Sequence, residues 1–219
     1  APAFIWKQLG TSCQNLPQAH TILRLIKLCT EVAAPGMALL GEAIVAPKEI
    51  MNYFGTENFT AKECDFAYNA TQMALQWDAL ATGDTRVMLA AQNILLQKPY
   101  GTSWITYTRC HDDIGLGYDD YMIQQSGFNT YEHRQFLKNY YSGSYYGSPA
   151  KGALFSYNPK TSDARISGTL ASLCGLQKAI EENNKDEITI AINRILLMQS
   201  FSFFIGGLPM IFYGDEVGY

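Results

Sequence analysis

Apolar residues recur along the chain with the spacing of amphipathic helices. A set of them after the candidate N-cap Asn15 predicts a helix that ends at Ala34: Ile22, Leu25, Ile26, Cys29 and Val32. Similar patterns predict further helices over residues 72–80, 85–96 and 187–205. These segments account for most of the predicted helical structure.

Short apolar runs between the helical segments predict strands over residues 37–45, 64–68, 103–108 and 208–213. Pro47 follows the first run and predicts a short helix through Tyr53. Because the runs are apolar throughout, they are typical of parallel strands that are covered on both faces. Alternation of such strands with helices predicts an α/β fold made of βα units.

Acidic residues stand at or just after the ends of the predicted strands: Glu42, Asp112, Asp113, Asp215 and Glu216. Barrel enzymes assemble their active sites at the C-terminal ends of their strands, so this pattern favours a barrel over an open sheet. A full TIM (β/α)8 barrel needs eight strands and about 250 residues. The chain has 219 residues and about four predicted strands, which predicts a partial TIM barrel.

Composition changes between Leu116 and Gly168, where Tyr, Gly, Ser and Asn become frequent and turn signals cluster. This change predicts a loop-rich inserted subdomain. The expected organisation is a barrel segment over residues 1–115, the inserted subdomain over 116–168 and a second barrel segment over 169–219.

Charge and composition narrow the range of partners. The 16 basic and 20 acidic residues are scattered, and no Lys/Arg-rich run could follow a phosphate backbone, so we expect no nucleic-acid partner. The longest apolar stretch, residues 188–213, is interrupted by polar residues and a proline, so we expect no membrane span.

The five widely spaced cysteines include no C-x-x-C pair, which favours reduced thiols in a cytoplasm over disulfides or structural zinc. No metal or cofactor is expected.

Glu42 and Asp112 are the candidates for acid/base chemistry. Cleavage of a glycosidic bond requires one carboxyl group to protonate the departing oxygen and another to handle the oxocarbenium-like centre. The apolar neighbours of Glu42 predict desolvation, which favours a neutral acid that can donate a proton. The alternative is a structural ion pair between Glu42 and a buried Arg or Lys.

The triplet His111-Asp112-Asp113 allows two interpretations. Its side chains could bind a metal, or they could form a catalytic or solvated polar cluster. In an extended strand, adjacent side chains point to opposite faces, so we expect only alternate members to share a site. His20 and His133 stand alone and are expected to be structural or exposed.

Four segments resemble the α-amylase superfamily of glycoside hydrolases, and within it especially the amylosucrases. Residues 41–45 resemble the segment with the acid/base glutamate, and residues 107–115 resemble the segment with the stabilising aspartate. Residues 3–13 look like the stretch that follows the nucleophile, and residues 208–218 look like the final barrel strand. The resemblance therefore implies roughly strands 5–8 of the barrel, preceded by the end of strand 4.

The resemblance also implies roles for five side chains. Glu42 would be the acid/base, Asp112 would stabilise the transition state, and His111 would hydrogen-bond the sugar. Asp113 and Arg165 would bind substrate on the acceptor side of the cleaved bond. The implied reaction is retaining glucosyl transfer from sucrose to an α-glucan acceptor.

The nucleophilic aspartate of the family precedes the segment that begins at Ala1. We therefore expect this chain alone to be inactive and, as an open barrel with unpaired edges, to self-associate. The alternatives are a sucrose hydrolase or α-glucosidase of the same superfamily, and a non-catalytic sugar-binding remnant. A doubly wound nucleotide binder is disfavoured because no G-x-G-x-x-G or Walker pattern follows any strand.

Overall fold

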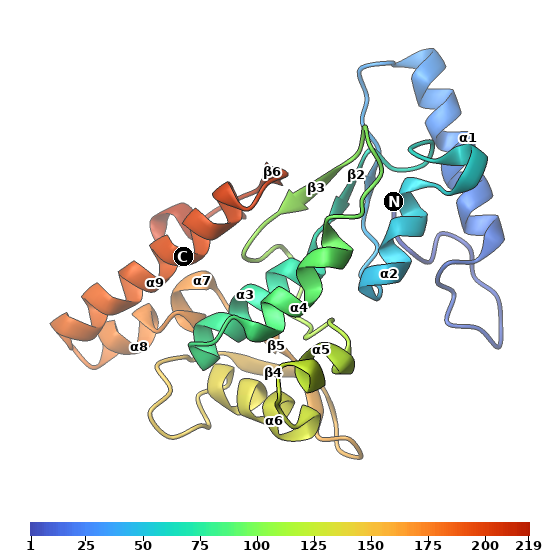
Figure 1. The fold of residues 1–219 in the computed structure, drawn as a ribbon. Helices are drawn as coiled ribbons and strands as arrows, with labels where there is room; N and C mark the ends of the chain where they lie inside the picture. The colour runs from blue at the N-terminus through green and yellow to red at the C-terminus, as the bar shows by residue number, and fades with distance from the viewer.

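A parallel sheet of four short strands, in the order β1-β2-β3-β6, lies at the centre of the fold (Figure 1). The computed structural model describes residues 1–219 and places these strands at Leu40–Gly41 (β1), Phe66–Tyr68 (β2), Ser103–Thr106 (β3) and Leu208–Pro209 (β6). Pro2 extends the sheet beyond β1 through a parallel bridge to Glu42.

The strand order follows the chain order without reversal. Doubly wound sheets reverse their order at a switch point, whereas barrel strands follow one another around the barrel. The parallel sheet and its helices are therefore compatible with the predicted partial barrel. The assignment to barrel strands 5–8 stays a prediction.

Each predicted helix is present, with small shifts of its ends. The helices outside the inserted segment are α1 (Pro17–Ala33), α2 (Pro47–Ile50), α3 (Ala70–Thr82), α4 (Arg86–Leu95), α7 (Leu170–Leu173), α8 (Leu176–Glu181) and α9 (Lys185–Phe204). Three 3-10 helices accompany them: η1 (Met51–Phe54), η2 (Glu57–Phe59) and η3 (Asp215–Val217). The short helices α7 and α8 were not predicted, because four to six residues are too few to show a helical period.

Two details predicted for α1 are wrong. Leu16 occupies the N-cap position and Pro17 begins the helix, so Asn15 does not cap it. The helix buries the face formed by Ala19, Leu23 and the stem of Lys27, while Leu25 and Val32 are exposed. Helical periodicity identified the helix but not its buried face, because apolar residues occur on both sides of α1.

The segment 116–168 contains more regular structure than its composition predicts. It forms α5 (Asp120–Gln125), α6 (Thr130–Tyr141) and an antiparallel hairpin of β4 (Ala153–Asn158) and β5 (Asp163–Ser167). A bridge between Ile114 and Ile166 joins the hairpin to the loop after β3. The predicted boundaries of this segment stay a prediction.

A buried polar network fastens the inserted segment to α3. Asp78 of α3 accepts a hydrogen bond from the Tyr118 hydroxyl, and its Oδ2 lies 2.6 Å from His133 Nε2 on α6. The His133 ring is buried, so this histidine is structural, as expected. One core therefore joins the sheet, α3 and the inserted segment, with Ala67, Trp77, Ile105, Tyr141 and Ile166 among its buried members.

All five cysteines are free thiols. No helix combines the length and the apolar character that a membrane crossing requires.

Candidate active site

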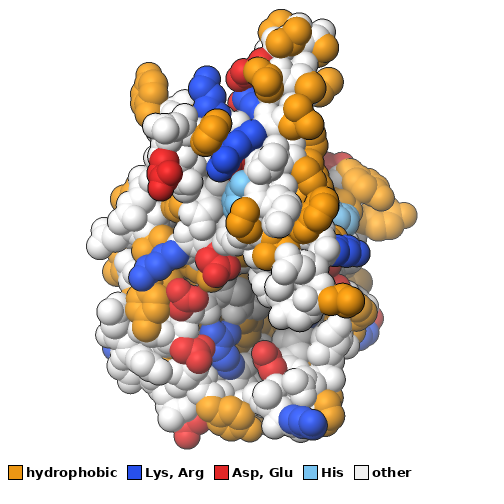
Figure 2. Space-filling model, turned by 90° about the vertical axis from the view of Figure 1, so that its right-hand side faces the viewer, with side chains coloured by type: hydrophobic (Ala, Val, Ile, Leu, Met, Phe, Trp, Pro, Cys, Tyr) orange, Lys and Arg blue, Asp and Glu red, His pale blue; other side chains and the backbone are white.

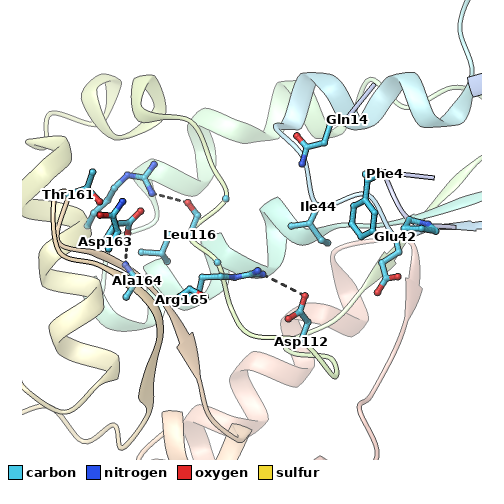
Figure 3. Close-up of a pocket in the computed structure, with 17 residues that line it drawn as sticks. Phe4, Gln14, Glu42, Ile44, Asp112, Leu116, Thr161, Asp163, Ala164 and Arg165 are labelled. Carbon is cyan, nitrogen blue, oxygen red and sulfur yellow. Dashed lines mark hydrogen bonds and ion pairs between the residues drawn. The ribbon is translucent and has the colours of Figure 1, made fainter. Parts of the chain in front are cut away.

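Glu42 and Asp112 line one cavity of about 710 Å³ at the C-terminal edge of the sheet. Glu42 directly follows β1, and Asp112 lies in the loop that follows β3. Because these strands are parallel, their following residues emerge at the same edge. Figure 3 shows the two carboxylates on separate loops around this cavity, and Figure 2 shows a hollow on one face of the molecule with acidic and basic side chains around it. The volume is typical of small-molecule sites.

The backbone of Glu42 is fixed while its side chain faces the cavity. Its N–H donates to the Ala1 carbonyl at 2.8 Å, and its carbonyl accepts from the Ala3 N–H at 3.1 Å. Extended residues alternate between faces, and here Ala43 enters the core while Glu42 turns outward. The backbone therefore sets the direction in which this carboxylate points.

The predicted desolvation of Glu42 is wrong, because 43% of its side chain is exposed. Its apolar sequence neighbours do not enclose it, since Ala43 is buried away from it and Ile44 is itself exposed. The alternative of a structural pair with a buried Arg or Lys is also not observed. The partner of Glu42 is the exposed His111, whose Nε2 lies 3.4 Å from Glu42 Oε1.

Residues 109–113 form an irregular loop with a bend at His111 and Asp112 rather than an extended strand, so the argument from alternating faces does not apply to them. His111 reaches Glu42, whereas Asp112 and Asp113 both face Arg165. All three members of the triplet therefore lie near the same site. Nowhere in the structure are three His, Cys, Asp or Glu side chains grouped so that they could hold a metal ion.

Arg165 reaches the site from β5 of the inserted segment. Its Nε lies 3.1 Å from Asp113 Oδ2. Its Nη2 lies 3.7 Å from Asp112 Oδ2, a contact that Figure 3 marks with a dashed line. The Asp113 contact is an ion pair without hydrogen-bond alignment, since that oxygen has no aligned donor. Arg165 Nη2 instead donates to the Asp113 carbonyl at 3.2 Å. One guanidinium thus contacts two adjacent carboxylates and offsets part of their negative charge.

Two ionisable groups beside Asp112 and Asp113 stay protonated near neutral pH. Burial raises the pKa of the Tyr107 phenol well above its usual value, and this ring packs edge-on against Tyr68 with centroids 5.2 Å apart. Burial also raises the pKa of the Cys110 thiol. Neither group is therefore suited to act as a base or as a thiolate nucleophile near neutral pH.

Six polar side chains on the cavity wall were not predicted as site residues: Gln14, Arg134, Ser156, Asn158, Thr161 and Asp163. Arg134 of α6 donates to the Leu116 carbonyl at 2.8 Å and holds that part of the wall. Gln14 precedes α1, and Asp163 begins β5. No local pattern marks these residues, because they meet the cavity only through the tertiary fold.

A comparison with models of protein families finds no match. Among curated proteins, the chain is 32% identical over 117 residues to glucosylglycerate phosphorylase of Escherichia coli (strain K12), which covers 53% of this chain and 20% of that protein. It is 24% identical over 221 residues to trehalose synthase/amylase TreS of Mycobacterium tuberculosis (strain ATCC 25618 / H37Rv), covering 100% of this chain and 30% of that protein.

A third relative is the trehalose synthase of Thermus thermophilus, which is 26% identical over 220 residues and covers 98% of this chain and 18% of that protein. The chain thus spans at most 30% of the length of these three relatives. All three are named as enzymes that make or break glucosides.

Proposed function

We propose that the protein is an α-glucoside-active enzyme of the α-amylase superfamily that works with retention, with Glu42 as acid/base and Asp112 as the carboxylate that stabilises the transition state. The observation that carries this proposal is the shared cavity, in which two carboxylates follow parallel strands of one sheet. The similarity to glucoside-active enzymes supports it. Free thiols throughout the chain support a cytoplasmic location.

In the proposed reaction, Glu42 first protonates the oxygen of the departing group. Its exposed carboxyl is open to a bound substrate, and it later accepts a proton from the incoming acceptor hydroxyl. Asp112 offsets the positive charge that develops on the sugar ring. His111, beside Glu42, would hydrogen-bond the same sugar.

Retention also requires a nucleophile, which the resemblance assigns to an aspartate preceding Ala1. Support comes from the backbone pairing of Ala1 and Ala3 with Glu42, which sets the beginning of this segment beside the acid/base. The carboxyl groups of a retaining pair lie about 5–5.5 Å apart, a spacing that neighbouring strand ends can supply.

The finer proposal is transfer of glucose from sucrose to an α-glucan. Beyond Asp112 the cavity continues along the β4–β5 hairpin, where its wall carries Ser156, Asn158 and Asp163. Hydroxyl, amide and carboxylate groups suit a ligand rich in hydroxyls, so an acceptor sugar is expected there. Arg165 belongs to the same wall and contacts both Asp112 and Asp113, so Asp113 and Arg165 would contact the acceptor side.

A second candidate is favoured by the names of the relatives: phosphorolysis of a glucosylglycerate or formation of trehalose. These reactions would use the same acid/base and the same stabilising carboxylate, and they differ in the acceptor. The acceptor therefore decides between them.

The test uses the full-length protein that the gene encodes, incubated separately with sucrose, trehalose and glucosylglycerate, with and without inorganic phosphate. Sugar products are quantified by chromatography. Fructose release from sucrose in excess of free glucose supports transfer, whereas equal amounts indicate a sucrose hydrolase. Phosphate-dependent glucose 1-phosphate indicates a phosphorylase, and sugar binding without any product indicates a non-catalytic binding protein.

Glu42→Gln in the same protein tests the acid/base assignment. Loss of a general acid/base lowers turnover by about 10²- to 10⁴-fold. Glu49→Gln is the matched control, because Glu49 is an exposed carboxylate on α2 that does not line the cavity. Near-parental turnover of Glu42→Gln would remove the assignment.

A further inference from the structure

The loop that carries His111 and Asp112 is held by side chains. Residues 109–113 take part in no backbone–backbone hydrogen bond. Regular elements fix their backbone through such bonds, whereas a loop without them depends on contacts made by its side chains. The direction in which His111 and Asp112 point therefore depends on the tethers around them.

Three tethers flank this loop. Trp77 of α3 donates its indole N–H to the Thr108 carbonyl at 2.8 Å. Arg165 contacts Asp112 and Asp113 from the inserted segment, with 38% of its own side chain exposed. The third tether is Arg109, which points away from the cavity toward the end of β6.

The Arg109 tether is an ion pair with Asp215, the first residue of η3. Arg109 Nη1 lies 3.0 Å from Asp215 Oδ1, and the two side chains are 15% and 0% exposed. The guanidinium also stacks on Phe212, 4.6 Å from the ring centroid. Because β3 and β6 are paired neighbours, this contact joins the ends of two adjacent strands.

Asp215 has no second side-chain partner. Its Oδ2 is buried without an aligned donor, and burial raises its pKa, while the Arg109 charge and the Leu170 backbone amide act in the opposite direction. Arg109 is thus the charge that compensates a carboxylate removed from water. A buried pair of this kind holds its partners in one geometry, because separation leaves a charge unpaired.

We propose that Arg109 and Asp215 are positioning residues that hold the loop 109–113 so that Asp112 faces the cavity containing Glu42 and His111 stays beside Glu42. Neither residue lines that cavity, so both act through the loop. The catalytic part of this inference rests on the proposed function. The structural part, that the pair fixes the loop, does not depend on it.

The test compares Asp215→Asn with Glu63→Gln in the full-length protein. Both substitutions keep the shape of the side chain and remove a carboxylate that is 0% exposed. Glu63 pairs with Arg24 of α1 at 2.9 Å and with His20 at 2.7 Å, and it does not line the cavity. It is therefore a matched control for the general cost of breaking a buried ion pair.

Two readouts are taken on each variant: hydrogen–deuterium exchange of the peptide that covers residues 108–114, and steady-state kinetics on the best α-glucoside. The exchange readout rests on the two hydrogen-bonded amides of this peptide, Asp113 N–H to Asp112 Oδ1 and Ile114 N–H to the Ile166 carbonyl, both at 2.8 Å. We expect both variants to melt at a lower temperature, but only Asp215→Asn to raise exchange in this peptide. We expect its kcat to fall about 10- to 100-fold with KM changed less than about threefold, since displaced catalytic groups lower turnover. Glu63→Gln is expected to keep the parental kcat.

Arg109→Lys serves as a second variant if Asp215→Asn does not fold, because lysine keeps the charge but loses the planar contact with Phe212. It is expected to raise exchange of the same peptide and lower kcat. Unchanged exchange over residues 108–114 would overturn the inference whatever the activity. Raised exchange with parental kcat would overturn its catalytic part. Absence of turnover by the parent on every glucoside would instead count against the proposed function, while the exchange comparison still decides whether the pair fixes the loop.

Discussion

The imidazole of His111 lies beside the carboxylate of Glu42, with Nε2 3.4 Å from Oε1. The contact joins loops that follow β1 and β3, two strands separated in the sheet by β2. The His111 side chain is 62% exposed and the Glu42 side chain is 43% exposed, so solvent screens the interaction and it is weak in the free protein. A bound sugar would exclude water from this contact and strengthen it.

We expect His111→Asn to lower kcat/KM by about 10- to 100-fold in the full-length protein, because the variant loses the contact of the imidazole with the Glu42 carboxylate. A hydrogen bond to a charged group is worth about 1.5–3 kcal/mol. Steady-state kinetics on the preferred glucoside provide the measurement. His20→Asn is the control, since His20 also contacts a glutamate, but its partner Glu63, unlike Glu42, does not line the cavity. Equal kinetics for the two variants would exclude a role for His111 at the site.

Arg165 offers a second prediction because it engages two carboxylates at once. Lysine is a point charge and cannot reproduce a forked contact. We therefore expect kcat/KM to decrease in the order parent, Arg165→Lys, Arg165→Met, with the methionine variant leaving Asp112 and Asp113 as unpaired neighbours. The ratio of transfer to hydrolysis, read from fructose and glucose release, should shift toward hydrolysis if Arg165 contacts the acceptor.

Arg86→Met is the control for the loss of an arginine. Arg86 pairs with Asp84 only two residues away, is 58% exposed and does not line the cavity. We expect this variant to retain parental kinetics. An Arg165→Met enzyme with the same kinetics would show that its ion pairs are dispensable for the reaction.

Local patterns in the sequence were sufficient to predict the longer helices outside residues 116–168, because a helix is stabilised largely by contacts within one segment, but α5, α6, α7 and α8 were not predicted. The patterns over 72–80 and 187–205 correspond to α3 and α9. Strand ends were predicted less well: the apolar run 37–45 contains only two strand residues, Leu40 and Gly41. Apolar side chains indicate burial, whereas strand length depends on which backbone groups find a neighbouring strand.

The sequence also predicted that Glu42 and Asp112 would share one edge of the sheet, because parallel strands direct their C-terminal ends to the same side. It could not predict the Arg109–Asp215 pair, whose members are 106 positions apart along the chain. Nor could it predict that Ala43, rather than Glu42, would occupy the apolar interior. Both depend on contacts between distant segments, which periodicity does not encode.

The five thiols should differ in reactivity. Burial raises the pKa of both Cys64 and Cys174 from 9.0 to about 12, whereas Cys29 is exposed on α1. The thiolate is the reactive form, so at pH 8 we expect Cys29 to react rapidly with Ellman's reagent and Cys64 and Cys174 to react only after unfolding. Mass spectrometry of labelled peptides identifies the modified residues. Rapid labelling of Cys64 or Cys174 in folded protein would contradict the prediction.

The same pKa values predict a loss of stability at alkaline pH. Between pH 9 and about 12, unfolded protein releases protons from Cys64 and Cys174 that folded protein retains. The contribution of these two thiols to the free energy of unfolding is fully present below pH 9 and decreases as pH rises through this window. We expect the urea midpoint to fall from pH 8.5 to 10, and to fall less in Cys174→Ala.

The polypeptide of residues 1–219, expressed alone, should self-associate. Two apolar surfaces lie on helices at opposite ends of the molecule (Figure 1), one on α1 with Leu25, Leu28 and Val32, and one on α9 with Leu196, Leu197 and Phe204. Val32 is 80% exposed and Phe204 is 88% exposed. Exposed apolar patches and the unpaired outer edge of β6 are both sites at which chains associate.

Light scattering coupled to size-exclusion chromatography at increasing concentration tests this expectation. The substitutions Leu28→Glu and Phe204→Glu should shift the distribution of oligomeric states toward monomer, because a charged side chain opposes association of apolar surfaces. Thr21→Glu is the control, since Thr21 is an exposed polar residue on the same helix α1. A monodisperse monomer of the parent with one sharp, cooperative unfolding transition would show that neither apolar surface requires a partner.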